Sequence, residues 1–290
     1  MKSKSERFLV SLRSVKNYVM VAPAAIIIGI FLVVPLLFVV LMSFYTSSSF
    51  GYQPILTLNN YIKLFSSLTN FRVFTTTFEL SAIMIALTLV AAYPISYLLA
   101  YKVRSPRIQS LVLLMLLLPF LMDYSIRSLS WFPILGPSGI VNQMLIATHV
   151  ESQPTNLLFS TNALIVIWLQ TYLLFMITPI YLSLVKIDPS LVPAARSLGA
   201  SPTQAFWNVT FRLSLPGVIV GVIYVLVGTI SDFATPEFLG GGLQTIGLTI
   251  FQNQSAFVWP AAGALSVVLM GIIVILAILI IRFVNIKEFF

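Results

Sequence analysis

Long apolar runs constrain this chain more than any other feature of its sequence. Six stretches are long enough and poor enough in charge to cross a bilayer as helices, which takes about 20 mostly apolar residues. A helix can cross because it satisfies its own backbone polar groups, which lipid cannot do. The sequence therefore predicts an all-α polytopic membrane protein with six transmembrane helices, at residues 18–43, 73–101, 108–132, 160–184, 213–231 and 259–281.

Composition indicates that lipid is the main solvent of this chain. Of its 290 residues, 59% are hydrophobic and only 8% are charged, whereas soluble domains carry about 25% charged residues. This balance excludes a soluble enzyme, a disordered chain and a nucleic-acid-binding module. The net charge of +8 comes from residues at predicted membrane boundaries, so it does not indicate a nucleic-acid partner.

The distribution of Lys and Arg predicts the orientation in the membrane. Cytoplasmic segments of membrane proteins are enriched in these residues. Thirteen of the 16 lie in the N-terminal tail, two connections and the C-terminal tail, namely Lys2, Lys4, Arg7, Arg13, Lys16, Lys102, Arg104, Arg107, Lys186, Arg196, Arg212, Arg282 and Lys287. Both termini are therefore expected in the cytoplasm, with tails at 1–17 and 285–290 around a membrane domain at 18–284. The basic N-terminus resembles a signal peptide, but its apolar run is too long, so a retained first helix is expected.

The two long outer connections carry turn and helix signals. Asn59 and Asn60 are candidate N-caps of a short helix. The segment 136–139 reads as a turn, and a short interfacial helix is predicted to begin at Ile140. His149 and Glu151 are too few for a metal site, so a solvated loop is the expectation there.

The inner connection at 186–212 carries the densest set of signals. Asp188-Pro189 and Ser201-Pro202 each place an N-cap residue before a proline, and Gly199 is suited to end a helix. Two short cytoplasmic helices joined by a sharp turn are predicted. Local pattern leaves two interpretations open: an ordinary helix–turn–helix connection, or a docking element for a soluble partner.

Five ionisable residues fall within the predicted spans or at their ends, where charge is costly and often functional. Asp123 and Arg127 are four residues apart on one helix face, so they either form a structural ion pair or line a path. Glu79, Asp232 and Glu237 have no evident basic partner. They are either solvated near helix ends or part of a path for a cationic substrate, for which Tyr124, Trp131 and Trp168 could supply cation–π contacts.

Catalytic signatures are missing from the sequence. The chain has no phosphate-binding loop with a Lys-Ser/Thr pair, so it is not expected to hydrolyse nucleotide. One histidine and no cysteine exclude a His-based catalytic triad, a His-rich metal centre and thiol chemistry. No cofactor or metal is expected in this chain.

The segment LVPAARSLGAS at 191–201, followed by LSLPG at 213–217, resembles the EAA loop of ATP-binding-cassette (ABC) importer permeases. Further stretches at 118–120, 139–143, 232–241 and 259–266, with Arg127 and Trp131, are similar to the spermidine/putrescine permease branch. The resemblance covers nearly the whole chain. It implies ATPase-coupling positions at Pro193, Ala194, Ala195, Leu198, Gly199, Ala200, Ser201, Phe206, Pro216 and Gly217.

The resemblance also implies a setting and partners. The expected protein is a type I ABC importer permease of the bacterial inner membrane, with a polyamine as substrate. It would pair with a second homologous permease, an ABC ATPase dimer that binds ATP and Mg, and a periplasmic or lipid-anchored substrate-binding protein. Import of opines, phosphonates or ferric iron is the alternative. A stand-alone ion-coupled secondary transporter and a polytopic membrane enzyme are further classes that fit the sequence less well.

Two positions depart from the family pattern. Pro193 stands where the EAA motif has a glutamate, and Arg212 stands where the family has a proline. Proline inside a helix removes a hydrogen bond. Pro193 would therefore break a helix begun at Pro189, unless the helix starts at Pro193 itself.

Overall fold

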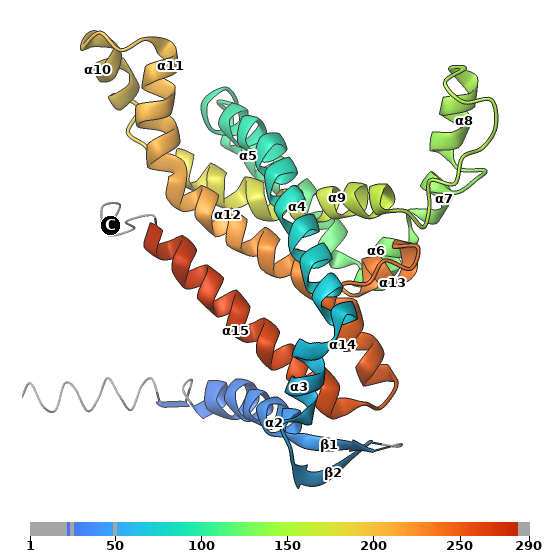
Figure 1. The fold of residues 1–290 in the computed structure, drawn as a ribbon. Helices are drawn as coiled ribbons and strands as arrows, with labels where there is room; N and C mark the ends of the chain where they lie inside the picture. The colour runs from blue at the N-terminus through green and yellow to red at the C-terminus, as the bar shows by residue number, and fades with distance from the viewer. Residues whose placement is uncertain (1–21, 24–25, 49–50, 284–290) are drawn as a thin grey trace, which may run out of the picture. The chain divides into compact units, whose positions relative to one another are not determined.

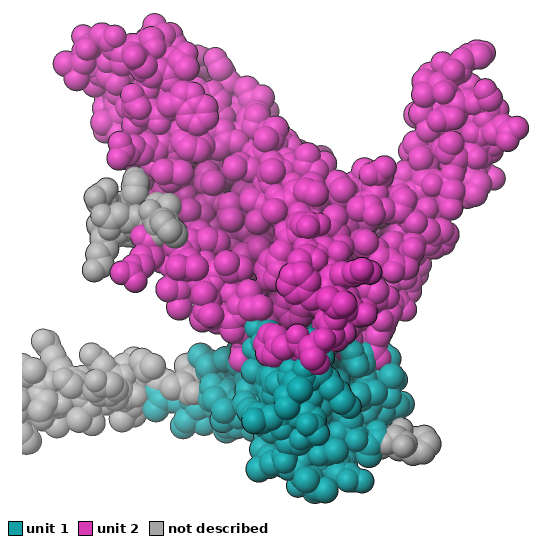
Figure 2. Space-filling model, in the orientation of Figure 1, with its two compact units in different colours: residues 1–64, 253–268 teal, residues 65–252, 269–290 magenta. Residues whose placement is uncertain are grey.

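A computed structural model describes residues 22–23, 26–48 and 51–283. The tails predicted at 1–17 and 285–290, and the beginning of the first predicted span, lie outside the described residues. The chain divides into two compact units (Figure 2). Unit 1 contains residues 1–64 and 253–268, and unit 2 contains residues 65–252 and 269–290.

Five helical segments of the described chain are long and apolar enough to cross a membrane (Figure 1). They are 26–43, which includes the π-helical η1 (Gly29–Val33) and α2 (Val34–Ser43), then α4 (Leu68–Tyr101), α9 (Thr161–Leu184), 202–231, and α15 (Trp259–Phe283). A bent pair of helices makes a sixth if it is counted as one span. The predicted all-α polytopic class is therefore confirmed.

The third span is broken, so the prediction of one continuous helix at 108–132 is wrong. It consists of α5 (Pro106–Leu117), the 3-10 turn η2 (Leu118–Leu121) and α6 (Tyr124–Leu129). The bend between residues 106–121 and residues 124–147 is 101°. The backbone is extended at Met122 (ψ 149°) and at Asp123 (ψ 146°). The Asp123 carboxylate caps α6 by accepting from the N–H groups of Ser125 and Ile126. A capped helix start inside an apolar run ends the preceding helix.

The core of unit 2 is the packing of α4, α9 and α12 (Arg212–Ser231). Trp168, Met84 and Met176 are fully buried there. Glycine lets the helices approach closely: a Cβ at Gly217 of α12 would lie 2.3 Å from the carbonyl oxygen of Pro179 in α9. Small residues at helix crossings are the usual means of close packing between membrane helices.

Shorter helices complete unit 2. They are α7 (Phe132–Leu135), α8 (Ile140–Ala147), α10 (Leu191–Ser197), α11 (Pro202–Ala205), the π-helical η3 (Phe206–Phe211), α13 (Ala234–Leu239) and most of α14 (Ile246–Ser255). The helix predicted to begin at Ile140 is confirmed as α8. Leu135, Leu158 and Leu239 form a separate small core with residues of α9.

Unit 1 contains an antiparallel hairpin that the sequence reading did not predict, of β1 (Tyr45–Ser48) and β2 (Gly51–Leu56). The following helix, α3 (Asn59–Ser66), begins at the predicted Asn pair. Asn60 does not cap it, because its amide donates to the carbonyls of Ser43 and Tyr45, each at 2.8 Å. Thr57 accepts from the Asn59 N–H instead, at 3.1 Å.

Candidate functional site

The 186–212 connection begins with a turn fixed by Asp188. Its carboxylate accepts hydrogen bonds from the Ser190 backbone N–H at 2.8 Å and from the Ser190 hydroxyl at 2.7 Å. These two donors lower the pKa of the Asp188 carboxyl below its usual value. The predicted helix start at Asp188-Pro189 is wrong, because Asp188 holds an Asx turn and α10 begins at Leu191.

Pro193 is the third residue of α10. The first N–H groups of a helix have no partner within it, so a proline there loses no hydrogen bond. The hydrogen bonds within the helix begin at the next residue, where the N–H of Ala194 donates to the carbonyl of Ser190 at 3.0 Å. The helix therefore starts neither at Pro189 nor at Pro193, and Pro193 does not break it.

Gly199 ends α10 in the left-handed conformation, with φ +92°. Its N–H donates to the carbonyl of Arg196 at 3.0 Å, and the N–H of Ala200 donates to the carbonyl of Ala195 at 3.1 Å. These two bonds are the Schellman pattern, which satisfies the last carbonyls of a helix. The sharp turn predicted at Gly199 is confirmed.

Ser201 starts the next helix with a capping box. Its hydroxyl accepts from the Gln204 N–H at 3.2 Å, while the Gln204 side chain accepts from the Ser201 N–H at 2.9 Å. Pro202 is the first residue of α11, as its fixed φ favours. Two short helices were predicted, but only α10 is separate: α11, η3 and α12 form one continuous helical segment over residues 202–231 (Figure 1).

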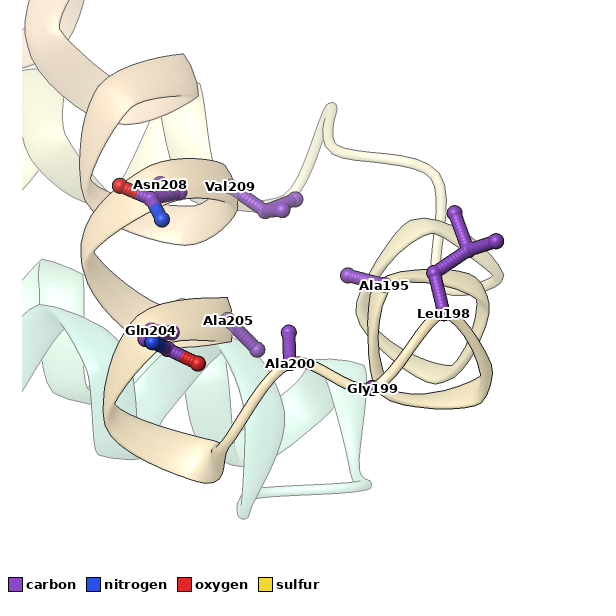
Figure 3. A pocket seen from close by; sticks show the side chains of 8 residues that line it. All are labelled: Ala195, Leu198, Gly199, Ala200, Gln204, Ala205, Asn208 and Val209. Carbon is purple, nitrogen blue, oxygen red and sulfur yellow. The ribbon is translucent and has the colours of Figure 1, made fainter.

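A hollow of about 400 Å³ lies between α10 and the segment formed by α11 and η3 (Figure 3). Its lining is almost uncharged and consists of Ala195, Leu198, Gly199, Ala200, Gln204, Ala205, Asn208 and Val209. Leu198 is 90% exposed at the tip of the turn. Small side chains on both walls therefore leave an open apolar surface, which is the form that a docking element requires.

Six of the ten implied coupling residues do not line this hollow. Pro193, Ala194 and Ser201 belong to the two helix starts and α10, whereas the other three lie in or against the helix bundle. Phe206 is half-buried and packs edge-on against Tyr93 of α4, with ring centroids 5.8 Å apart. Pro216 lies within α12, and Gly217 lies at the crossing with α9. The structure therefore separates exposed turn residues from residues that connect the turn to the bundle.

A second polar centre lies at the far end of α12. Asp232 follows the last residue of that helix and is 4% exposed. Its carboxylate accepts from the indole N–H of Trp168 in α9 and, at 3.1 Å, from the backbone N–H of Thr235 in α13. No Lys, Arg or His within the described residues forms an ion pair with it. Its two hydrogen-bond donors are neutral groups, an indole and a backbone amide.

Tyrosines surround this carboxylate. Tyr172 lies one turn after Trp168 on α9, and its hydroxyl is 3.2 Å from that of Tyr124 in α6. Both hydroxyls lie within electrostatic range of Asp232. The Trp168 and Tyr172 rings are in edge contact, with centroids 6.5 Å apart. We call Asp232, Trp168, Tyr172 and Tyr124 the Asp232 cluster.

Arg127 does not pair with Asp123, so the ion-pair interpretation, one of the two left open by the sequence, is wrong. Asp123 is exposed and caps α6, whereas Arg127 is 5% exposed. The Arg127 guanidinium lies over the rings of Phe120 and Tyr124, 4.7 and 4.6 Å from their centroids. It also donates to the carbonyl of Pro119 at 3.5 Å. The cation therefore faces aromatic rings instead of a carboxylate.

The other candidates lie apart from the Asp232 cluster. Glu79 is exposed on α4, and Glu237 is exposed on α13, where it accepts from Gln252 at 3.4 Å. Trp131 packs in the small core around Leu135. His149 is exposed, and the part of the chain that the structure describes holds no group of three or more His, Cys, Asp or Glu suited to a metal ion.

The sequence reading missed Tyr172 and Thr235 as members of this centre. Tyr172 could have been found from its spacing, since residues four apart share one face of a helix and Trp168 was already a candidate. Thr235 had no such signal, because its role depends on the turn between α12 and α13.

Comparison with known proteins is informative over most of the chain. Residues 92–286 match the family model for binding-protein-dependent transport system inner membrane components. The chain is 33% identical over 254 residues to the spermidine/putrescine transport system permease protein PotB of Haemophilus influenzae, with 86% of each chain covered.

Solved structures share the fold. A chain of a bacterial ABC transporter that imports the acidic polysaccharide alginate matches with a TM-score of 0.72 and 18% identity, covering 97% of this chain and 98% of that one. A chain of a bacterial alginate ABC transporter in complex with an alginate pentasaccharide-bound periplasmic protein matches with a TM-score of 0.68 and 20% identity, covering 94% and 93%.

Proposed function

This chain belongs to the family of binding-protein-dependent transport system inner membrane components, and from that membership we propose that it is a polyamine-conducting permease subunit of an ABC importer. Its family makes it a multi-pass protein of the bacterial inner membrane. Permease subunits of this family are not enzymes, because partner ATPases hydrolyse the ATP. The finer proposal concerns the substrate and the way in which the partners are coupled.

Coupling is assigned to the exposed turn between α10 and α11. We expect two ATPase subunits, which bind ATP and Mg, to contact the hollow beside Ala195 and Val209 and the projecting Leu198. ATP can drive transport only if it favours one conformation of the complex over another. Closure of the ATPases would then move the turn and, through it, the spans of this chain and of a second, homologous permease.

A polyamine is favoured by the charge of the Asp232 cluster. A buried carboxylate without a cationic partner gains most from an arriving cation, and the aromatic rings of Trp168 and Tyr172 suit an ammonium group. The name of the H. influenzae relative points to the same substrates, spermidine and putrescine. Asp232 is the single observation that carries this assignment.

The alternative, an anionic substrate such as a phosphonate or an opine, is favoured by the buried cation of Arg127. Its guanidinium is buried, but both of its aromatic contacts and its carbonyl acceptor come from the chain itself. It is therefore already partnered, whereas Asp232 forms no ion pair with a Lys, Arg or His of the described residues. We expect a soluble substrate-binding protein to deliver the polyamine to the outer face of the complex.

Uptake of radiolabelled spermidine and putrescine tests the proposal. The complete importer is expressed in cells that lack other polyamine uptake systems, with this chain as wild type, Asp232→Asn or Glu237→Gln. We expect wild-type and Glu237→Gln cells to import, and Asp232→Asn cells to show a KM at least about tenfold higher, equivalent to about 1.4 kcal/mol. Glu237 is the matched control because it is an exposed acid only five residues away.

Three results would contradict parts of the proposal. If the wild type imports neither amine, the polyamine assignment is wrong, and opines, phosphonates and ferric iron are tested next. If Asp232→Asn behaves like the wild type, the carboxylate does not bind the substrate. If the purified chain carries no ATPase subunit and imports without one, the protein is a stand-alone transporter.

A further inference from the structure

The turn between α10 and α11 is joined to the membrane helices through η3. Helix α10 packs on α11 and η3, and η3 continues directly into α12. A movement of the turn therefore reaches α12 through the chain itself. The question is how α4, which is distant in sequence, would follow the same movement.

Two phenylalanines of η3 pack against one tyrosine of α4. The ring of Phe206 is nearly perpendicular to that of Tyr93, at 83° and a centroid distance of 5.8 Å, and Phe211 lies 5.4 Å from the same ring. Phe206 also meets Tyr97, the next residue on that face of α4, at 6.0 Å. Aromatic pairs in edge-to-face or offset geometry stabilise a contact beyond the burial of their surface.

A hydrogen bond between Tyr93 and Ser214 also joins α4 to α12 beside these rings. The Ser214 hydroxyl donates to the carbonyl of Phe211 at 2.8 Å, and it lies 2.9 Å from the Tyr93 hydroxyl. Because the serine has a single proton and gives it to Phe211, Tyr93 is the donor of the second bond. Ser214 and the Tyr93 ring are both buried, so this bond is not exchanged with water.

We propose that Tyr93, Tyr97, Phe206 and Phe211 form an aromatic joint that makes α4 move with the α10–α11 turn. The inference rests on the proposed function, since the movement is the one that ATP drives. Phe206 and Tyr93 are positioning residues in this scheme: neither contacts nucleotide or substrate, and neither belongs to the exposed docking surface. The π-helical geometry of η3 fits such a role, because π-helical turns within α-helices occur frequently at functional sites.

The test uses the complete transporter in proteoliposomes, with its ATPases and its binding protein. ATP hydrolysed and radiolabelled spermidine transported are measured together for wild type, Phe206→Ala, Tyr93→Phe and Phe78→Ala. Phe78 is the matched control, because it is a half-buried phenylalanine of α4 that packs in a different cluster. Size-exclusion chromatography verifies that each variant still carries its ATPases.

We expect Phe206→Ala to keep its ATPases and to hydrolyse ATP, while spermidine transported per ATP falls by about tenfold, a usual size for coupling between sites. Tyr93→Phe should show a smaller fall, since it loses only the hydrogen bond. An unchanged ratio in Phe206→Ala, or an equal fall in Phe78→Ala, would overturn the joint. A wild-type complex that does not import spermidine with ATP would instead refute the proposed function.

A cross-link provides a test that does not depend on loss of function. The chain has no cysteine, so Tyr97→Cys with Phe206→Cys introduces the only two thiols of this subunit. We expect the reduced double variant to be uncoupled and a short bifunctional thiol reagent to restore transport per ATP. Each single-cysteine variant should not respond to the reagent. If the cross-link abolishes transport, the contact has to open during the cycle and the joint is not rigid.

Discussion

Gly199 shows how one backbone angle can set the shape of the turn that we propose as the docking surface. Its φ is +92°, and a Cβ placed on it would meet no atom within 4 Å. A substitution there is therefore opposed by backbone strain and not by a clash. The left-handed conformation costs a non-glycine residue about 1–2 kcal/mol, less for Asn and more for β-branched residues.

Because backbone strain alone opposes a side chain at position 199, substitutions there should act in the order of the strain they cause. We expect the amount of co-purified ATPase and the rate of uptake to fall in the order Gly, Asn, Ala, Val at position 199. Insertion of the protein into the membrane should not change, because the strain is confined to the turn. Gly271→Val is the control, since Gly271 is an uncrowded glycine in α15. Full transport by Gly199→Val would show that the shape of the turn is unimportant.

We expect Trp168 to hold Asp232 in place through the hydrogen bond from its indole N–H. Trp168→Phe keeps an aromatic side chain but removes the indole N–H, so one buried carboxylate oxygen loses its donor. We expect a loss of stability of about 1–3 kcal/mol, the usual cost of an unsatisfied buried acceptor. Thermal unfolding in detergent measures it, with Trp207→Phe, at a half-exposed indole, as the control. An unchanged unfolding temperature would mean that water or another donor replaces the indole.

At the scale of the elements, the crossing of α9 and α12 depends on Gly217. A methyl group there would lie 2.3 Å from the carbonyl oxygen of Pro179, which is backbone and cannot turn aside. We expect Gly217→Ala to separate the helices and destabilise the protein by about 1–3 kcal/mol, as overpacking does. Gly271→Ala, with nothing within 4 Å, should be neutral. Fluorescence-detected chromatography after heating compares the two; equal stability would show that the crossing is loose.

The elements that the sequence predicted well are those whose ends are marked by local chemistry. Ser160 and Ser201 cap α9 and α11 through their own hydroxyls, so both starts were found within one residue. The break at Met122 and Asp123 was missed because the apolar run continues across it, although Pro119 and the capping carboxylate of Asp123 both mark it. The hairpin at 45–56 was missed because its strands lie in a polar, turn-rich segment.

At the scale of the whole molecule, the orientation in the membrane is a prediction from the Lys and Arg distribution. Since the chain has no cysteine, single cysteines can report it directly. We expect a membrane-impermeant thiol reagent to label Leu198→Cys only from the cytoplasmic side and Met144→Cys only from the outside. Both side chains are exposed, so each is open to the reagent. Labelling of both positions from one side would refute the topology.

The candidate site could be predicted only in part, because some of its contacts are local in sequence and others are not. The coupling turn is local: its caps, glycine and small residues lie within a short segment, so the turn at Gly199 and the helix start at Pro202 were predicted. The start of α10 was predicted wrongly, and the continuity of α11 with η3 and α12 was missed. The Asp232 cluster is not local, because Trp168 lies 64 residues away from its carboxylate. No sequence spacing reveals such a contact, so Asp232 was a candidate without its partners.

Because the helical segment from Pro202 to Ser231 is continuous, the number of residues in it sets the direction in which the turn and its hollow face. An α-helix turns by about 100° per residue. Deleting one residue within η3 would therefore rotate the turn, and the hollow beside it, by about that angle relative to the bundle. Substitutions in η3 would leave the direction of the hollow unchanged, whereas a single insertion or deletion would aim it away from its partner. A chimera that exchanges this turn between permeases should thus be designed by counting residues before matching their chemistry.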